Sequence, residues 1–102
     1  MPVHDLQIAL AQINLTVGAI DTNTNRIIES IHTATDAGAD VILFPELSIC
    51  SYPPEDLLFR SRFYLQVKQA LERIVRATGK IHVLVGHPFK KDDIMYNACS
   101  LV

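Results

Sequence analysis

One carboxylate stands where an enzyme could use it. Residues 41–44, "VILF", form an apolar run that leads directly into Pro45 and Glu46. Proline fixes its own φ angle and biases Phe44 towards extended geometry, so the exit from this strand is rigid. Functional groups gather at the carboxyl ends of strands in parallel α/β sheets. A carboxylate held there beside apolar residues is expected to be partly desolvated, which suits a general base. On these residues alone, a solvated loop acid remains the alternative.

A cysteine thiol can act as a nucleophile, but the sequence around the two cysteines favours a structural role. Cys50 follows Glu46 closely, yet no local motif presents the histidine that usually activates a thiol. We therefore interpret Cys50 as a small buried residue, and Cys99, inside an apolar strand, in the same way. Two cysteines are too few for a secreted disulfide scaffold, which favours a reducing cytoplasm.

Metal-binding patterns are incomplete. Residues 21–25, "DTNTN", match the first oxygen-ligand positions of an EF-hand loop, but Arg26 stands where glycine is needed and His32 where glutamate is needed. The start of a helix capped by Asn or Thr is the favoured interpretation. No metal-ligand spacing joins the histidines, and a structural or surface role is expected for His4, His32, His82 and His87. Gly86 and His87, at a strand's carboxyl end, could line a pocket.

Composition excludes several classes of function. The chain has 102 residues, with 9 basic and 11 acidic side chains and a net charge of −2. It contains no basic run interleaved with aromatic residues, so a nucleic-acid partner is not expected. It contains no apolar stretch near the roughly 20 residues of a membrane span, and no signal peptide. Its length allows one domain or part of one.

The elements that must position these residues alternate between strands and helices. Strands separated by helices imply parallel neighbours joined by right-handed crossovers, and the charged turn "FKKDD" makes the last two strands antiparallel. The predicted fold is therefore α/β with the order β-α-β-α-β-β. Hydrophobic periodicity places strands at 6–13, 41–44, 81–86 and 95–102. It places one helix at 25–37 and a longer one from Ser61 to Gly79, and a short helical turn begins at Pro54.

Local signals predict ends and faces. Gly38 suits a left-handed helix end, and Ser61 suits a helix cap. The continuous run at 41–44 is typical of a strand buried on both faces. An apolar stripe in the first strand comprises Leu6, Ile8 and Leu10. The buried stripe of the longer helix is expected to comprise Phe63, Val67, Ala70, Leu71, Ile74, Val75 and Thr78. Val102 has no turn or cap after it, which favours the front part of a larger fold.

Three segments together carry a family resemblance. "IALAQINLTVGAIDTNTNRI", "AGADVILFPELSICSYPPEDLL" and "VLVGHP…YNACSLV" resemble the start of a carbon–nitrogen hydrolase (nitrilase-like) domain. "FPEL" preceded by "GAD" is specific for this family. "YPPEDLL" is similar to the members that hydrolyse glutamine on behalf of an attached synthetase. The resemblance covers nearly the whole chain and implies an α-β-β-α sandwich, of which residues 1–102 would be the front part.

The resemblance implies a Glu-Lys-Cys triad, in which the cysteine attacks the glutamine amide carbon and a thioester forms that water later hydrolyses. By position, Glu46 matches the general base, Tyr52 a residue near the glutamine pocket, and Asn97 a position that supports the site. The lysine and the nucleophile would lie beyond Val102. The local candidates do not match them: Lys80, Lys90, Lys91, Cys50 and Cys99.

The resemblance also implies what the ammonia is for. It would pass to a separate synthetase domain that uses ATP and Mg²⁺ to amidate nicotinic acid adenine dinucleotide to NAD⁺. Residues 1–102 would be the N-terminal portion of the glutaminase domain, inactive alone, with the synthetase domain absent and no cofactor of their own. Two alternatives stay open, a fragment of a stand-alone nitrilase-like amidase and a truncated non-catalytic module. Unpaired strand edges and a missing sheet layer predict a homo-oligomer.

Overall fold

The computed structural model describes residues 5–102, so His4 lies outside the described part. The predicted order of strands and long helices is confirmed. No helix among these residues is long and apolar enough to cross a membrane. The elements are β1 (Ile8–Leu10), α1 (Ile20–Asp36), β2 (Val41–Leu43), the 3₁₀ helix η1 (Glu55–Phe59), α2 (Ser61–Ala77), β3 (His82–Lys91) and β4 (Ile94–Leu101).

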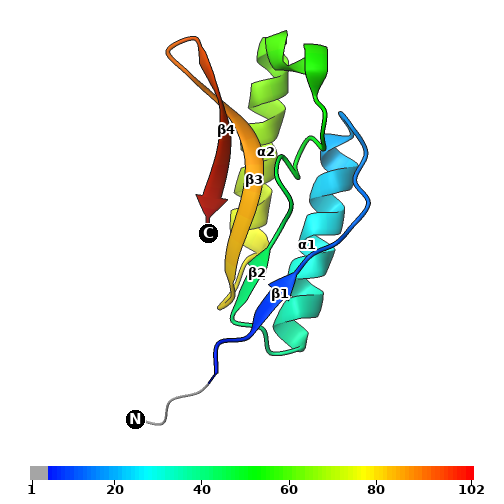
Figure 1. Cartoon of the computed structure of the whole chain (residues 1–102), viewed down its shortest axis with the longest axis vertical. Helices are drawn as coiled ribbons and strands as arrows, with labels where there is room; N and C mark the ends of the chain where they lie inside the picture. The colour runs from blue at the N-terminus through cyan, green and yellow to red at the C-terminus, as the bar shows by residue number, and fades with distance from the viewer. Residues whose placement is uncertain (1–4) are drawn as a thin grey trace.

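The strands form one mixed sheet in the order β1-β2-β3-β4 (Figure 1). β1, β2 and β3 are parallel, and β3 pairs with β4 as an antiparallel hairpin. The turn is shorter than "FKKDD" suggested, because β3 continues to Lys91. Only Asp92 and Asp93 connect the strands, with φ angles of 52° and 62°. Positive φ at both positions matches the twist of the flanking strands in two-residue hairpins.

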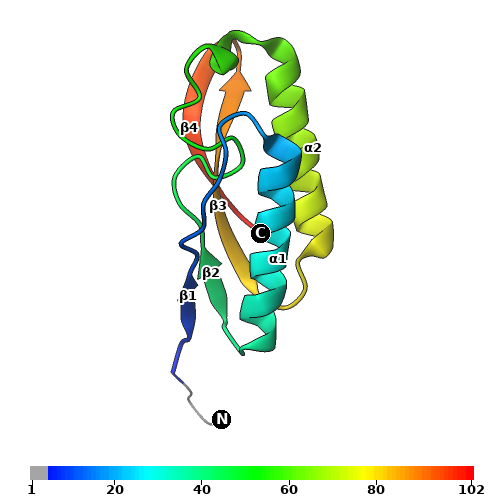
Figure 2. The ribbon, with the colours of Figure 1, turned by 90° about the vertical axis from the view of Figure 1, so that its right-hand side faces the viewer.

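Both long helices cover the same face of the sheet (Figure 2). Right-handed crossovers between successive neighbours β1, β2 and β3 place every connecting helix on one side. Ile27 and Ile31 of α1 and Ile74 of α2 are fully buried in the core cluster that also contains Val83 and Val85 of β3. The core therefore lies between one helical layer and one sheet.

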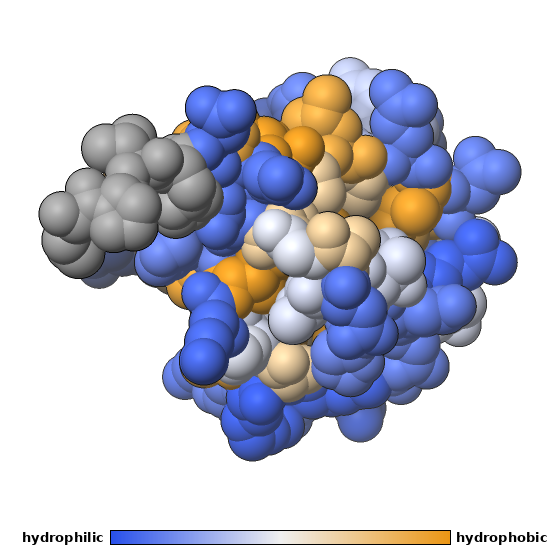
Figure 3. Space-filling view, turned by 90° about the horizontal axis from the view of Figure 1, so that it is seen from below, coloured by the Kyte–Doolittle hydropathy of each residue, from blue (hydrophilic) through white to orange (hydrophobic). Residues whose placement is uncertain are grey.

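The opposite side of the sheet, here called the open face, carries a row of leucines. Strand register aligns Leu10, Leu43, Leu84 and Leu101 across all four strands. The outer two, Leu10 and Leu101, are 69% and 68% exposed. Burial of 41–44 on both faces is thus wrong for this chain, since only Ile42 of β2 is buried. In Figure 3, apolar atoms reach the surface at the upper middle and the right of the view and again to the left of its centre.

The ends of the helices differ from the sequence prediction. α1 begins at Ile20 rather than Asn25, and Ala19 precedes it without a side-chain cap. "DTNTN" therefore lies inside the helix, and capping by Asn or Thr is wrong. Ser61 is the first residue of α2 and does not cap it, because Arg60 occupies that position. Gly38 does end α1 with a left-handed φ of 84°.

The second helix also departs from prediction at its surface and at its end. Phe63, Val67, Ala70 and Ile74 are buried as expected. Val75, which was assigned to the same stripe, is 52% exposed, because it lies next to Ile74 on the helix and points away from the sheet. α2 ends at Ala77, and Thr78 is already extended. Gly79 therefore follows the helix end without adopting a left-handed conformation.

Candidate active site around Glu46

Glu46 lies immediately beyond β2 and reaches across the sheet. The backbone N–H of Phe44 donates to the carbonyl oxygen of Leu84 at 3.0 Å, which holds the chain beside β3 up to that point. The side-chain Nδ2 of Asn97 then donates a hydrogen bond to Oε1 of Glu46. Asn97 is paired with Pro88 in the hairpin register and lies on the open face. Two residues singled out from the sequence are thus brought together by β3 and β4.

Exposure at this site differs from expectation. Glu46 and Asn97 are both exposed, so the partial desolvation expected for the carboxylate is wrong for this chain. The physical reason is that the helices cover the other face of the sheet. Tyr52 is 69% exposed and lies beyond the loop that carries Glu46. Its predicted place near a glutamine pocket stays a prediction.

Gly86 makes room for the backbone next to Glu46. A Cβ atom at Gly86 would lie 2.6 Å from the backbone nitrogen of Leu47 and 3.0 Å from the carbonyl oxygen of Pro45. Real Cβ atoms do not approach backbone so closely, so any side chain at Gly86 would displace the segment. The sequence suggested only that this residue could line a pocket. The structure assigns it a steric role, which depends on a contact between β3 and the segment after β2 that no local pattern reveals.

Residues 45–51, here called the Glu46 loop, have an unusual backbone. Leu47 and Ser51 have φ angles of 52° and 61°, in the left-handed region where a non-glycine residue costs roughly 1–2 kcal/mol. The Ser48 hydroxyl donates to the carbonyl oxygen of Pro45, and the N–H of Ile49 donates to that of Gly86 at 3.3 Å. All residues from Leu47 to Cys50 are buried. The loop is therefore packed into the protein, with Glu46 projecting from it.

The structural role predicted for Cys50 is confirmed. Its side chain is fully buried, and its Sγ lies 3.6 Å from the carbonyl oxygen of Leu47. Burial raises the pKa of the Cys50 thiol to about 11, although a hydrogen bond from the backbone of Cys50 itself acts in the opposite direction. A thiol that stays protonated is a poor nucleophile. Cys99 is a free cysteine too, but it is exposed, so its predicted burial is wrong.

His87 uses both ring nitrogens in contacts within the protein. His87 is buried on the helical side of the sheet. Its Nδ1 lies 3.1 Å from the carbonyl oxygen of Pro88, and its Nε2 lies 2.7 Å from Oγ of Ser100. A carbonyl only accepts, so Nδ1 donates and Nε2 of the neutral ring accepts the Ser100 proton. No group of three potential ligand side chains within residues 5–102 could hold a metal ion.

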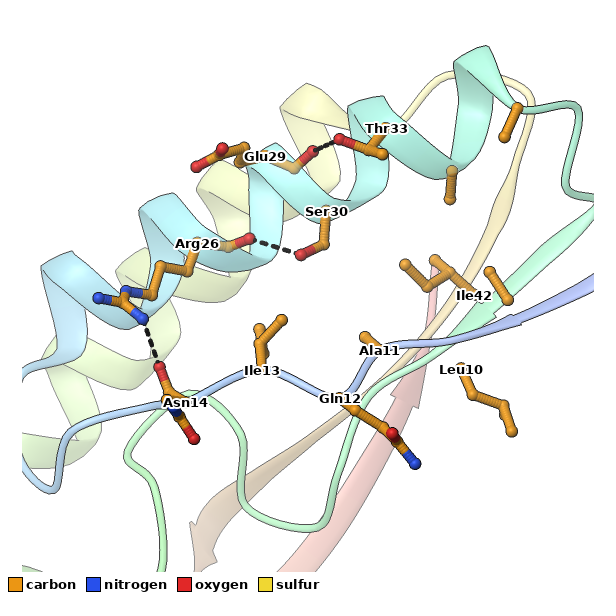
Figure 4. Close-up of a pocket in the computed structure, with 13 residues that line it drawn as sticks. Leu10, Ala11, Gln12, Ile13, Asn14, Arg26, Glu29, Ser30, Thr33 and Ile42 are labelled. Atoms are coloured by element: carbon orange, nitrogen blue, oxygen red, sulfur yellow. Dashed lines mark hydrogen bonds between the residues drawn. The ribbon is translucent and has the colours of Figure 1, made fainter.

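A hollow of about 720 Å³ lies apart from Glu46, between α1 and the segment from Ala9 to Asn14. Figure 4 shows Arg26 donating from α1 to the carbonyl oxygen of Asn14, a hydrogen bond of 2.7 Å. The hydroxyl of Ser30 is bound to the Arg26 carbonyl oxygen, so it is already used within the helix. The hollow opens beside the outer edge of β1, on the helical side of the sheet, and contributes nothing to the surroundings of Glu46.

The chain is similar to known proteins in both sequence and fold. The chain is 50% identical over 100 residues to a glutamine-dependent NAD(+) synthetase from Xanthomonas campestris, a match that covers 97% of this chain and 18% of the relative. The solved structure of a glutamine-dependent NAD(+) synthetase from Cytophaga hutchinsonii matches with a TM-score of 0.91 and 28% identity, over 95% of this chain and 17% of that one.

The glutamine-dependent NAD+ synthetase from Acinetobacter baumannii, solved with ADP, matches with a TM-score of 0.89 and 34% identity. The match covers 95% of this chain and 18% of the A. baumannii protein. The chain therefore spans less than a fifth of the length of these relatives. The sequence model of the carbon–nitrogen hydrolase family matches residues 7–102. With almost all of its residues inside that match, the chain belongs to the carbon–nitrogen hydrolase family.

Proposed function

We propose that Glu46 is the general base of a glutamine-hydrolysing site, in a longer protein of the length of these relatives. Residues 1–102 would form the N-terminal portion of its glutaminase domain. The released ammonia would serve a synthetase domain that amidates nicotinic acid adenine dinucleotide to NAD⁺. The observation that carries the proposal is the hydrogen bond from Asn97 to Glu46 at the end of β2, in a chain 50% identical to a synthetase that depends on glutamine.

The geometry suits proton transfer by Glu46. Asn97 occupies one carboxylate oxygen, which fixes the plane of the carboxylate and leaves the other oxygen to accept a proton. In the proposed reaction, Glu46 takes the proton of a cysteine thiol whose sulfur bonds to the amide carbon of glutamine. The carbon–nitrogen bond then breaks, and the nitrogen leaves as ammonia with that proton. Water cleaves the resulting thioester to give glutamate and to restore the thiol.

The remaining assignments belong to the same proposal. Tyr52 would lie beside the bound glutamine, and Asn97 would support the base. ATP and Mg²⁺ would bind to the synthetase domain. The described residues do not fit them, because residues 5–102 hold no cluster of three potential ligands and the sequence has no glycine-rich phosphate loop. The unpaired cysteines Cys50 and Cys99 support a reducing, cytoplasmic location.

The test compares two nitrogen sources in the full-length protein. Glu46→Gln should lower glutamine-driven NAD⁺ synthesis by about 10²–10⁴-fold, the usual contribution of a general base, and leave ammonia-driven synthesis unchanged. Asp56→Asn, an acid of η1 in the same region, is the control and should affect neither rate. Glutamine-driven synthesis near the wild-type rate in Glu46→Gln would refute the role of the base. Amide hydrolysis without any NAD⁺ synthesis would favour the stand-alone amidase instead.

A further inference from the structure

The "DTNTN" segment contains a residue that neither a metal site nor a helix cap explains. Asn23 lies in the first turns of α1 and is fully buried. Its Oδ1 accepts from the backbone N–H of Thr16 at 2.9 Å, and its Nδ2 donates to the carbonyl oxygens of Thr16 at 2.8 Å and Ile49 at 3.1 Å. One side chain therefore joins the segment after β1 to the Glu46 loop.

The chemistry of these partners allows only asparagine in this arrangement. The Thr16 N–H needs an acceptor, whereas the two carbonyl oxygens need donors, so the amide has one possible orientation. Aspartate would keep the acceptor but would place its second oxygen against two carbonyl oxygens. Alanine would leave these backbone groups without partners in a buried position, which proteins rarely tolerate.

The Glu46 loop depends on such support. Leu47 and Ser51 hold left-handed conformations that persist only where the surroundings impose them. A second link between the same segments is the bond from the Gly18 N–H to the Cys50 carbonyl oxygen, at 3.0 Å. The Ser51 hydroxyl also donates to the carbonyl oxygen of Leu15, at 3.3 Å. Asn23 differs from these links because it is fully buried and binds both segments at once.

We propose that Asn23 is a positioning residue, which fixes the Glu46 loop so that the carboxylate of Glu46 stays in place for proton transfer. Asn23 holds the buried half of the loop, and Gly86 allows the other half to pass close over β3. This inference rests on the proposed function, since it assumes that Glu46 is the base. Asn23 acts through the backbone at Ile49 and does not touch the reacting atoms.

The link that Asn23 makes between the segment after β1 and the Glu46 loop is here called the clamp. Hydrogen exchange in the full-length protein tests the clamp without any measurement of activity. Asn23→Ala should speed exchange of the Thr16 and Ile49 amides at least tenfold. The Thr16 N–H loses its acceptor, and the bond from the Ile49 N–H to Gly86 opens more often once the loop is no longer held through the Ile49 carbonyl oxygen. Asn25→Ala is the matched control. Asn25 is an asparagine of the same helix, but it is exposed and accepts a hydrogen bond from Arg73 of α2 at 2.6 Å. Unchanged exchange in Asn23→Ala would overturn the proposal.

Kinetics tests the consequence for Glu46. Asn23→Ala and Asn23→Asp should lower kcat for glutamine by about 10- to 100-fold, because small displacements of a catalytic group are costly. The KM for glutamine and the ammonia-driven rate should stay at wild-type values, as should all rates in Asn25→Ala. If Asn23→Asp does not fold, Asn23→Ser serves in its place. Faster exchange with an unchanged kcat would overturn the positioning role.

A double mutant separates positioning from general destabilisation. If Asn23 acts through Glu46, then Asn23→Ala should lower the residual activity of Glu46→Gln less than twofold. Two independent, multiplied losses would overturn the proposal, since they are expected of a purely structural residue. If Glu46→Gln itself retained wild-type glutamine hydrolysis, the proposed function and the positioning role would both fall. The clamp between the segments would still be judged by exchange.

Discussion

The two faces of the sheet are built from the same strands but differ in burial. On the helical face, Ile42 and Val83 are neighbours in register and almost fully buried. The next residue along each strand points to the open face and belongs to the row of leucines. Leu10 and Leu101, at the two ends of this row, are exposed. Both faces are apolar, so hydrophobic composition does not distinguish them. The difference comes from topology, because right-handed crossovers place both helices on one side.

The proposed chemistry lies on the open face, away from the core. Glu46 and Asn97 meet there, whereas the buried groups of the helical face are already matched with partners, as His87 is with Ser100. Substitutions on the helical face should therefore change the free energy of unfolding. Substitutions on the open face should change self-association and catalysis.

The largest effect on stability should come from isoleucines on the two faces. Ile42→Ala should lower the free energy of unfolding by about 2–5 kcal/mol, because it opens a cavity in the core. Ile8→Ala, on the neighbouring strand but 53% exposed, should cost at most about 0.5 kcal/mol. Urea denaturation of the 102-residue chain, at a concentration low enough to keep it monomeric, provides both values. Equal losses would show that Ile8 is buried within the monomer.

Association should reveal the next largest effect. The 102-residue chain should self-associate at micromolar concentration, because apolar faces larger than a few hundred Å² rarely stay in water. Replacing Leu10 and Leu101 with lysine should weaken self-association at least tenfold, which corresponds to about 1.4 kcal/mol. Light scattering measures this shift, with Val75→Lys on the solvent side of α2 as the control. A wild-type monomer that unfolds cooperatively would contradict the prediction.

The two cysteines show the same contrast between a buried and an exposed position, and their reactivity can measure it. At pH 8, a thiol reagent should modify Cys99 quickly and Cys50 only after unfolding, since Cys99 is exposed and Cys50 is buried. The pKa of Cys50 rises from 9.0 to about 11 on folding, so ionisation favours the unfolded chain. Stability should therefore be intact below pH 9 and fall as the pH rises towards 11, and Cys50→Ala should remove this part of the decline. Rapid labelling of native Cys50 would contradict its burial.

The smallest effect should come from the hairpin turn, which belongs to neither face. Asp93→Gly should raise the free energy of unfolding by less than about 1 kcal/mol, because glycine adopts positive φ without steric cost. Thermal unfolding monitored by circular dichroism measures the gain. Asp36→Gly, at the end of α1 where φ is not positive, is the control and should not stabilise the chain. A clear loss in Asp93→Gly would show that the Asp93 side chain supports the turn.

The sequence predicts what depends on neighbours along the chain. Periodicity and turn residues identify the order of elements, and the Pro45-Glu46 exit places the carboxylate at the end of its strand. The motif resemblance adds Asn97, which the structure joins to Glu46. The role of Asn23 could not be predicted, because its partner at Ile49 is separated from it by 26 positions. The exposure of Leu10 cannot be predicted from the apolar pattern of its strand, which looks the same whether one face or both are covered; only the missing layer implied by the resemblance predicts it.

The contact between Glu46 and Asn97 also sets an order of assembly during synthesis. The two residues are 51 positions apart, and β3 lies between them in the sheet. Before β4 pairs with β3, the chain can already close the core that β1, β2, β3 and the two helices build, but Glu46 has no amide to hold its carboxylate. The core is therefore a product of early folding, whereas the site is completed only when the hairpin closes.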